Sequence, residues 1–282
     1  MAEITASAVK SLRDRTGAGM MDCKRALEDS GGDEERAIDL LRQRGAAKAA
    51  KRAGRDVSEG VVHIASDNRS VSMVEVLTET DFVARSDPFV EFARGTAEAL
   101  LGLDLPDGVV IEGEALFSYE GGEGLQGDLN ELRLAVGENV QLGHSVRLDR
   151  PPSTQVGSYL HFGGRIGVLV EVTGDDESAA EAARIVAMHV AATSPAGVSP
   201  DDIPPDVVER ERSVLVEQAK GEGKPPEIAK KIVEGRMRKF FEENALLEQA
   251  YVRDPQRKVK DVVAAAGEGI AVTRFVRFEV GR

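Results

Sequence analysis

The sequence contains little of several residue types, and each shortage excludes a class of protein. There is no tryptophan, and aromatic residues make up 4% of the chain beside 41% hydrophobic and 30% charged residues, a composition that favours several small, well-solvated units over one large core. The single cysteine, Cys23, excludes an intramolecular disulfide and suits a reducing compartment. No apolar run approaches the ~18 residues that would span a bilayer, and the N-terminus does not form a signal or transit peptide. We therefore expect a cytoplasmic protein without a membrane partner.

Positive charge and metal-binding patterns are also scarce. The formal net charge is -13, whereas a nucleic-acid-binding surface needs a surplus of Lys and Arg. One basic stretch, residues 42–55 "RQRGAAKAAKRAGR", is interpreted as a solvated helix face or linker and not as an RNA-binding patch. The four histidines have no ligand-type spacing, and no G-x-S-x-G elbow or Gly-Lys-Ser/Thr phosphate loop occurs. The chain is therefore not expected to bind nucleic acid, a metal or a cofactor, or to perform covalent catalysis.

Residues 1–55 have helical periodicity and predict a small three-helix domain followed by a linker. Gly17 is predicted to end the first helix with a left-handed cap, and Asp22 and Asp33 are predicted to cap the second and third helices. The turn before the second helix is expected to display Met20 and Met21, because flexible methionine side chains suit contact surfaces.

After this domain the period changes from helical to alternating, which predicts a core of two α+β subdomains. The first, residues 56–138, begins with the hairpin "GVVHIASDNRSVSMVEVLT" and continues with a helix after Pro88 and another near residues 125–136. The second, residues 139–195, begins with a strand near residues 139–149. Each subdomain is expected to consist of an antiparallel sheet backed by helices.

An internal repeat relates the two subdomains. The stretch "GSYLHFGGRIGVLVEVTGDDESAAEAARIVAMHVA" from Gly157 repeats the hairpin-and-helix pattern that starts at Gly60, and it places His161 where the first copy has His63. Where the first copy connects strand to helix with "TETDFVARSDPF", the second has "TGDDESAA". The fold therefore does not require the acid and the large aromatic, Asp81 and Phe82, that stand in this polar turn.

Residues 196–247 interrupt the second subdomain with two helical runs separated by "GEGKPP". Glycine ends the first run and proline restarts the second, which predicts an inserted antiparallel helical hairpin. Its narrow apolar stripes are formed by Val208, Leu215, Ala219, Ile228, Ile232, Met237, Phe240 and Phe241. Such a hairpin is expected to protrude and to meet a partner or its own copy, so a homodimer through the hairpin or the core is possible. Residues 248–282, with the alternating "TRFVRFEV", return to the second subdomain.

By pattern alone, the chain is a multi-domain interaction protein with one unusual turn, but longer motifs add a family resemblance. "LRDRTGAGMMDCKRAL" (residues 12–27) and "ETDFVAR" (residues 79–85) resemble the two signature stretches of the bacterial elongation factor Ts family. "AMHVAATSP", "IVEGRMRKF" and "RFVRFEVG" extend the similarity over nearly the whole chain. The resemblance implies an α+β multidomain fold with a ubiquitin-associated-like three-helix domain, a core of two subdomains and an inserted helical hairpin.

The resemblance also implies a function. Members of this family are guanine-nucleotide exchange factors that bind elongation factor Tu, both GDP-bound and nucleotide-free, and make or break no covalent bond. In the family, the Asp and Phe of a Thr-Asp-Phe motif enter elongation factor Tu beside the nucleotide and disturb its Mg²⁺ site. The matching residues are Asp81 and Phe82, flanked by Thr80 and Val83.

Further contacts are implied elsewhere in the chain. The family's N-terminal domain grips the nucleotide-binding domain of elongation factor Tu, and the matching residues are Arg13, Met20 and Met21. The second subdomain contacts another domain of that protein, with His161 as a weaker candidate.

The sequence departs from the family pattern in two places. Leu77 and Thr78 stand where an Asn and a Cys usually precede Thr-Asp-Phe, and the sequence stops at Arg282 where some members continue into a further helix, whose contacts are not expected here. Two other interpretations compete with exchange activity. The three-helix domain alone could be a binding module without exchange activity, or its glycine turn could bind a dinucleotide in an enzyme.

Overall fold

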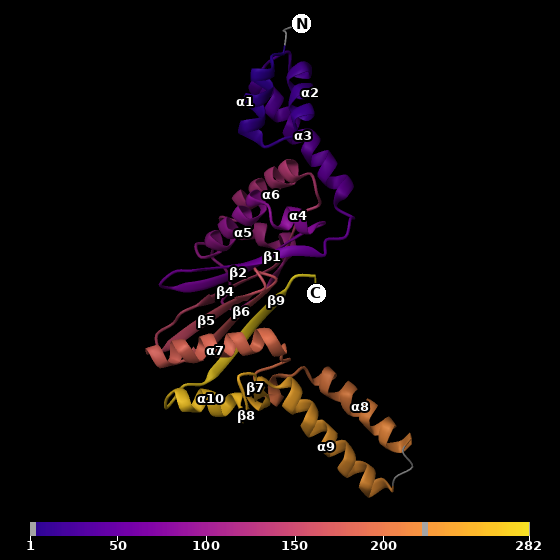
Figure 1. The fold of residues 1–282 in the computed structure, drawn as a ribbon, viewed down its shortest axis with the longest axis vertical. Coiled ribbons are helices and arrows are strands. Elements are labelled where there is room, and N and C mark those ends of the chain that lie inside the picture. Colours follow the sequence, from indigo (N-terminus) through magenta and orange to yellow (C-terminus); the bar gives the residue numbers. More distant parts are fainter. Residues whose placement is uncertain (1–3, 222–224, 282) are drawn as a thin grey trace. The chain divides into compact units, whose positions relative to one another are not determined.

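The computed structural model describes residues 4–221 and 225–281, which divide into two units (Figure 1). The first unit comprises Met1–Asp149, Phe162–Ile166 and Phe278–Arg282, and the second comprises Arg150–His161 and Gly167–Arg277. Both units mix helices with antiparallel sheet, which confirms the α+β multidomain class.

Three helices form the N-terminal part of the first unit: α1 (Ala6–Thr16), α2 (Met20–Ser30) and α3 (Glu34–Arg52). Their apolar faces pack into a small core of Val9, Leu12, Ala18, Cys23, Ala26, Leu27, Ala37 and Leu41. The predicted three-helix domain is therefore present, and α3 continues through much of the basic stretch 42–55.

The ends of these helices agree with two of the three predicted caps. Gly17 ends α1 with φ 65°, a left-handed conformation in which its N–H bonds to the Arg13 carbonyl. Asp33 Oδ1 accepts a hydrogen bond from Arg36 N at 3.0 Å and so caps α3. The predicted cap at Asp22 is wrong: α2 already begins at Met20, because the Gly19 carbonyl accepts the first helical hydrogen bonds.

The rest of the first unit is a sheet covered by helices. Strands β1 (Glu59–Ser66), β2 (Ser70–Thr78), β4 (Gln141–Asp149) and β3 (Ile111–Glu112) lie side by side in this order. All three strand pairs are antiparallel. The covering elements are α4 (Asp81–Ala84), α5 (Asp87–Leu100), the short 3₁₀ helix η1 (Gly113–Ser118) and α6 (Glu123–Val136).

The pairing of strand β4 shows that one predicted boundary is wrong. The boundary at 138/139 assigns this strand to the second subdomain, but β4 pairs with β2 from Ser70–Asp149 to Leu77–Gln141 and therefore belongs to the first sheet. Strand pairing joins residues far apart in sequence, so the alternating pattern alone does not reveal the partner. The other predicted boundaries remain predictions.

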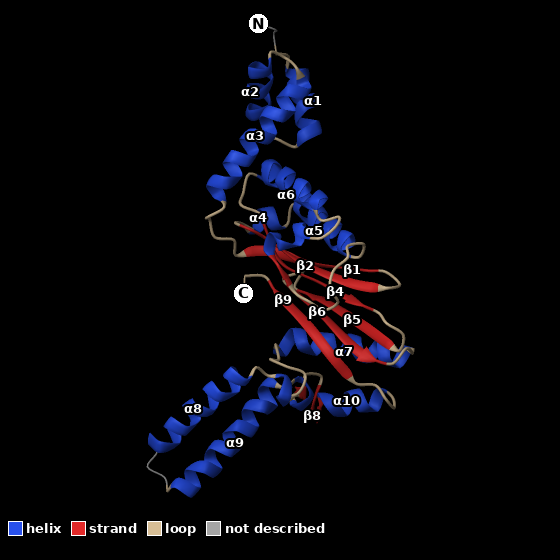
Figure 2. Cartoon of the chain, turned by 180° about the vertical axis from the view of Figure 1, so that it is seen from behind, coloured by secondary structure: helices blue, strands red, loops and turns tan. Residues whose placement is uncertain are grey.

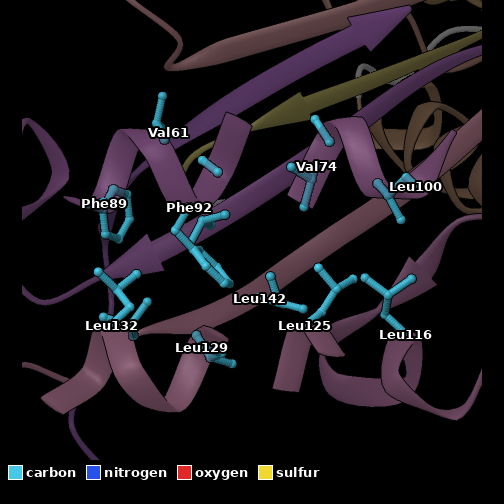
Figure 3. Packing of buried hydrophobic residues seen from close by; sticks show 14 of the residues in the cluster. Val61, Val74, Phe89, Phe92, Leu100, Leu116, Leu125, Leu129, Leu132 and Leu142 are labelled. Carbon is cyan, nitrogen blue, oxygen red and sulfur yellow. The ribbon is translucent and has the colours of Figure 1, made fainter. Parts of the chain in front are cut away.

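One hydrophobic core joins this sheet to its helices. Phe89 and Phe92 of α5 lie beside Leu129 and Leu132 of α6 (Figure 3), and the valines of β2 that face these helices include Val74. The helix expected after Pro88 is present as α5, and one of its faces is buried, formed by Phe89, Phe92, Ala93, Thr96 and Leu100. The core holds the end of β2 and the start of α5 in place, and these two elements flank the Thr-Asp-Phe motif.

The second unit repeats the same succession of two strands and a helix. Its main sheet contains β5 (Thr154–His161), β6 (Ile166–Thr173) and β9 (Val272–Glu279), and α7 (Glu177–Thr193) lies along it (Figure 2). The packing is close, because a Cβ atom at Gly157 would lie 2.4 Å from the backbone carbon of Ala183 in α7. The remaining elements are η2 (Pro200–Asp202), η3 (Leu246–Glu248), β7 (Ala250–Tyr251), β8 (Asp254–Lys258) and α10 (Val259–Ala266).

The inserted segment folds as two helices, α8 (Pro205–Gly221) and α9 (Pro226–Asn244), which pack on each other. Leu215, Ala219 and Met237 are buried as predicted, whereas Ile228 is exposed and Val233 takes the inward position. Residues 222–224 of the predicted "GEGKPP" turn lie outside the described residues. Dimerisation through this hairpin or the core remains a prediction.

Candidate functional site

The Thr-Asp-Phe motif lies where β2 leaves the sheet. The expected polar turn is a single helical turn, α4, of four residues, which Thr80 precedes as the N-cap. Thr80 has extended backbone angles, and its Oγ1 accepts a hydrogen bond from Val83 N at 3.4 Å. The chain then continues through Ser86 into α5, so the Thr80–Val83 turn is an addition between strand and helix.

The four residues of the Thr80–Val83 turn divide into two that are held and two that project. Val83 packs against the hydrophobic core, and Thr80 is fixed by hydrogen bonds. Asp81 forms an ion pair of 3.1 Å with Arg85, one helical turn later. Phe82 is 84% exposed, the highest value among the exposed large hydrophobic residues of the described chain. The arrangement presents an aromatic ring and a carboxylate on a short, anchored turn.

Glu138 anchors the turn from the segment between α6 and the neighbouring strand β4, although nothing in the sequence pattern singled it out. Its Oε2 accepts hydrogen bonds from Thr78 Oγ1 at 2.9 Å and Thr80 N at 3.1 Å, and its Oε1 accepts one from Thr80 Oγ1 at 2.7 Å. Because 58 residues separate Glu138 from Thr80, no local motif could have revealed this contact. The strand pairing of β2 with β4 brings the two together.

Glu79 makes the reciprocal contact. Its Oε1 accepts a hydrogen bond from Asn139 N at 2.6 Å, and its Oε2 lies 3.1 Å from Arg55 Nη1. The backbone N–H of Asn139, with Arg55 adding a smaller effect, lowers the pKa of Glu79 below its ordinary value. Asn139 Nδ2 also donates to the Arg55 carbonyl at 2.8 Å, which ties the segment after α3 to the same corner.

Leu77 and Thr78, the residues that depart from the family pattern before Thr80, are accommodated in this structure. Thr78 is fully buried, and its hydroxyl is one of the three donors to Glu138. Leu77 lies opposite Gly60 and Gln141 in the sheet. Both residues therefore contribute to the end of β2 that supports the Thr80–Val83 turn.

The other predicted contact residues lie on separate elements. Arg13 is exposed on α1, and Met20 and Met21 begin α2 with 46% and 59% of their surface exposed. Cys23 of the same helix is fully buried in the core of the three-helix domain, and burial raises the pKa of its thiol. His161 is the last residue of β5, where its Nδ1 lies 2.9 Å from the Tyr159 hydroxyl.

The residues that the structure describes contain no group of three or more His, Cys, Asp or Glu side chains arranged to hold a metal ion. Within the same ranges, no helix combines the length and apolarity needed to cross a membrane.

Comparisons with known proteins agree with the sequence resemblance. The family model described as Elongation factor TS matches residues 79–282. The Elongation factor Ts of Alkalilimnicola ehrlichii is 46% identical over 281 residues, which cover 99% of this chain and 92% of that protein. That of Rhodospirillum rubrum is 46% identical over 294 residues, covering 100% of this chain and 94% of the relative. That of Nitratidesulfovibrio vulgaris is 42% identical over 290 residues, covering 99% and 96%.

Proposed function

The chain belongs to the elongation factor Ts family, and on this premise we propose that it is a translation elongation factor that binds elongation factor Tu and promotes exchange of its GDP for GTP. It acts in the cytoplasm, where translation takes place, on both the GDP-bound and the nucleotide-free partner. The chain itself makes and breaks no covalent bond, so it is an exchange factor without covalent catalysis.

Exchange is carried by the Thr80–Val83 turn. In this proposal, the Phe82 ring enters an apolar slot of elongation factor Tu, and the turn with Asp81 disturbs the nearby Mg²⁺. Magnesium demands near-ideal octahedral oxygen geometry, so a small displacement of its ligands weakens its hold on GDP. The observation that carries the proposal is that an 84% exposed phenylalanine stands on a turn whose backbone is fixed from two sides.

The free energies required are within reach of such a contact. GDP and the exchange factor are two ligands of one protein, so if each weakens the other, the factor is the same in both directions. Every tenfold weakening of GDP corresponds to about 1.4 kcal/mol. A buried aromatic anchor contributes about 2 kcal/mol or more at an interface, which is sufficient for a large acceleration of GDP release.

Two further surfaces support binding in this proposal. Arg13, Met20 and Met21 grip the nucleotide-binding domain of elongation factor Tu, because exposed methionines adapt to an apolar partner surface. His161, at the end of β5, is a weaker contact of the second subdomain with another domain of elongation factor Tu. These surfaces supply affinity, while the Thr80–Val83 turn supplies the effect on GDP.

Release of fluorescent GDP from elongation factor Tu tests the proposal. Substoichiometric amounts of the chain should accelerate release, because a factor that makes no lasting product complex turns over. Phe82→Ala should lose most of this acceleration while its circular dichroism spectrum and melting temperature stay close to those of the wild type. A chain that accelerates release only at stoichiometric amounts, or not at all, would contradict exchange activity.

A second candidate function is a binding module without exchange activity, formed by the three-helix domain. The exposure of Met20 and Met21 favours a partner surface there. This function requires that deletion of residues 1–54 abolish binding to the partner while Phe82→Ala changes nothing. Comparing the two variants for binding and for GDP release distinguishes the two functions.

A further inference from the structure

The sheet ends in an unusual way beside the Thr80–Val83 turn. The last backbone pair of β2 and β4 is Leu77 with Gln141. Beyond this pair, the segment after β2 leads into α4, and the segment before β4 comes from α6. The backbone N–H groups of Thr80 and Asn139 lie in these two segments, outside the strand pairing. Such groups require a partner when water is largely excluded.

Two carboxylates, each from the opposite segment, supply these partners. Glu138 accepts the hydrogen bond of Thr80 N at 3.1 Å, and Glu79 accepts that of Asn139 N at 2.6 Å. The side chains thus continue the pairing that the backbone has ended. Hydrogen bonds to an ionised carboxylate are stronger than those between neutral groups, so this corner is held more firmly than an ordinary strand end.

Glu138 is placed for this contact by the end of α6. Gly137 follows the helix with φ 74°, and its N–H bonds to the Arg133 carbonyl at 3.2 Å. This left-handed residue turns the chain sharply, so that Glu138 lies opposite the residues after β2. The carboxylate then gathers three donors, from Thr78 and twice from Thr80, on its two oxygens.

The consequence concerns Phe82. A single helical turn is not stable alone, because nucleation of a helix is unfavourable, and α4 has only four residues. Its direction is therefore set by the residues that hold its ends. Phe82 is 84% exposed, so packing within the chain does little to orient its ring.

We propose that Glu138 is a positioning residue for GDP release: its carboxylate fixes Thr80 at the start of α4 and thereby the direction in which Phe82 projects. The proposal rests on the proposed function and adds to it a residue that lies outside the Thr-Asp-Phe motif. Glu138 acts through the Thr80–Val83 turn and does not itself need to touch elongation factor Tu.

The chain offers a matched control in its second unit. Glu171 is buried where Glu138 is half-buried, and it too gathers three donors, Thr273 Oγ1 at 2.5 Å and Arg274 at 3.1 and 2.6 Å. It lies within strand β6 and not beside an exposed aromatic turn. Loss of a carboxylate that gathers three hydrogen bonds should destabilise both sites, but only Glu138 should affect release of GDP.

Kinetics of fluorescent GDP release give the first test. Glu138→Ala should lower the maximal release rate about tenfold, since a misplacement of about 1 Å is costly to a positioned group. Glu138→Gln retains one acceptor oxygen and should lower the rate about threefold. Glu171→Gln should keep the wild-type maximal rate. In a Phe82→Ala background, Glu138→Ala should cause no further loss, because two residues that act as a unit are not additive.

Fluorescence of a single tryptophan gives the second test, which does not depend on exchange activity. The chain has no tryptophan, so Phe82→Trp introduces one reporter on the turn. In the free protein, the anisotropy decay of this tryptophan should gain a faster component when Glu138→Ala is added. With Glu138→Gln, the amplitude of this faster component should be smaller. Adding Glu171→Gln should leave the decay unchanged.

The outcomes separate this proposal from the proposed function. If Phe82→Ala loses activity but Glu138→Ala and Glu138→Gln keep the wild-type rate, the positioning role is overturned and the exchange function stands. An equal loss from Glu138→Ala with and without Phe82 would show a merely structural role and would also overturn it. A fully active Phe82→Ala variant contradicts the role of the ring in exchange. If Glu138→Ala leaves the anisotropy decay of Phe82→Trp unchanged, the positioning role is overturned, whatever the activity of Phe82→Ala. Should Glu138→Ala fail to fold, Glu138→Gln provides both measurements.

Discussion

The two halves of the core make the same connection from strand to helix in different ways. In the second unit, residues 174–176 join β6 to α7 directly, whereas in the first unit residues 79–86 join β2 to α5 and contain the extra helix α4. In the short connection, Gly174 turns the chain with φ 111° and Asp176 caps α7 by accepting a hydrogen bond from Ala179 N at 2.8 Å. A glycine and one capping acid are therefore enough for this fold.

The longer connection in the first unit uses more residues and more contacts. It needs Thr80 as a cap for α4, two carboxylates for the N–H groups beyond the ladder, and Val83 against the core, and it exposes a phenylalanine. None of this is required to join a strand to a helix, as the second unit shows. The first connection therefore contains residues that joining a strand to a helix does not require, and its exposed aromatic is suited to contact with another protein, as proposed above.

The largest effect is expected when the two connections are made alike. Replacing residues 79–86 by Gly-Asp-Asp should give a folded protein, because the second unit folds with this connection. Its GDP-release rate should fall at least about 100-fold, the scale expected when a positioned group is lost. Thermal melting checks that the variant is folded, and GDP release measures its exchange activity. Retention of exchange activity would show that exchange does not need the longer connection.

The reverse replacement is the matched control for that variant. Inserting the sequence of residues 79–86 in place of residues 174–176 should leave GDP release unchanged, because the partners that the structure describes for Thr173 Oγ1 and Gly174 N include the Gly269 and Ser153 carbonyls, where the first connection has the Glu138 carboxylate. A gain in exchange activity would mean that the turn acts without its surroundings.

A smaller and more selective effect is expected from the two equivalent threonines at the strand ends. Thr78 donates to Glu138 at 2.9 Å, and Thr173 donates to the Gly269 carbonyl at 2.5 Å. Thr78→Val and Thr173→Val should each lower the free energy of unfolding by about 1 kcal/mol. Only Thr78→Val should also slow GDP release, by about threefold, because its partner holds the turn. Urea unfolding and GDP release check both statements, and equal exchange rates for the two variants would contradict the difference between the connections.

The smallest expected effect is a pH dependence that arises from Glu79 in the first connection. The pKa of Glu79 is lowered in the folded protein, first by Asn139 N–H and then by Arg55, so the unfolded chain binds the proton more tightly. The stabilisation is therefore fully present above the unfolded pKa of about 4.3 and is lost as the pH falls through the folded pKa. Glu79→Gln should abolish this part of the acid dependence in unfolding experiments, and an unchanged difference between the two proteins from pH 6 to pH 3 would contradict it.

Local patterns predicted much of the fold. The strand and helix periods located the β1–β2 hairpin, the three N-terminal helices and the two helices of the inserted segment, and the repeat from Gly60 to Gly157 corresponds to the same order of elements in both units. Errors arose where an element is displaced along the sequence, as at Gly19, which starts α2 before Asp22, and in α9, where Ala229 and Val233 pack inward next to the expected Ile228 and Ile232.

Non-local contacts could not be predicted in the same way. The assignment of β4 depends on pairing with β2, and α4 is too short to have a helical period of its own. Glu138 is part of the site only because that pairing brings it to Thr80. The motif therefore revealed which residues project, and the structure was needed to show what holds them.

The most direct test of the account is the maximal rate of fluorescent GDP release from elongation factor Tu by Phe82→Ala. Compared with the wild type, the rate should fall at least about 30-fold, which corresponds to an aromatic contact of about 2 kcal/mol. Val109→Ala, which shortens another exposed apolar side chain of the first unit, 49% exposed, should release GDP at the wild-type rate. A folded Phe82→Ala protein that releases GDP as fast as the wild type would contradict the account.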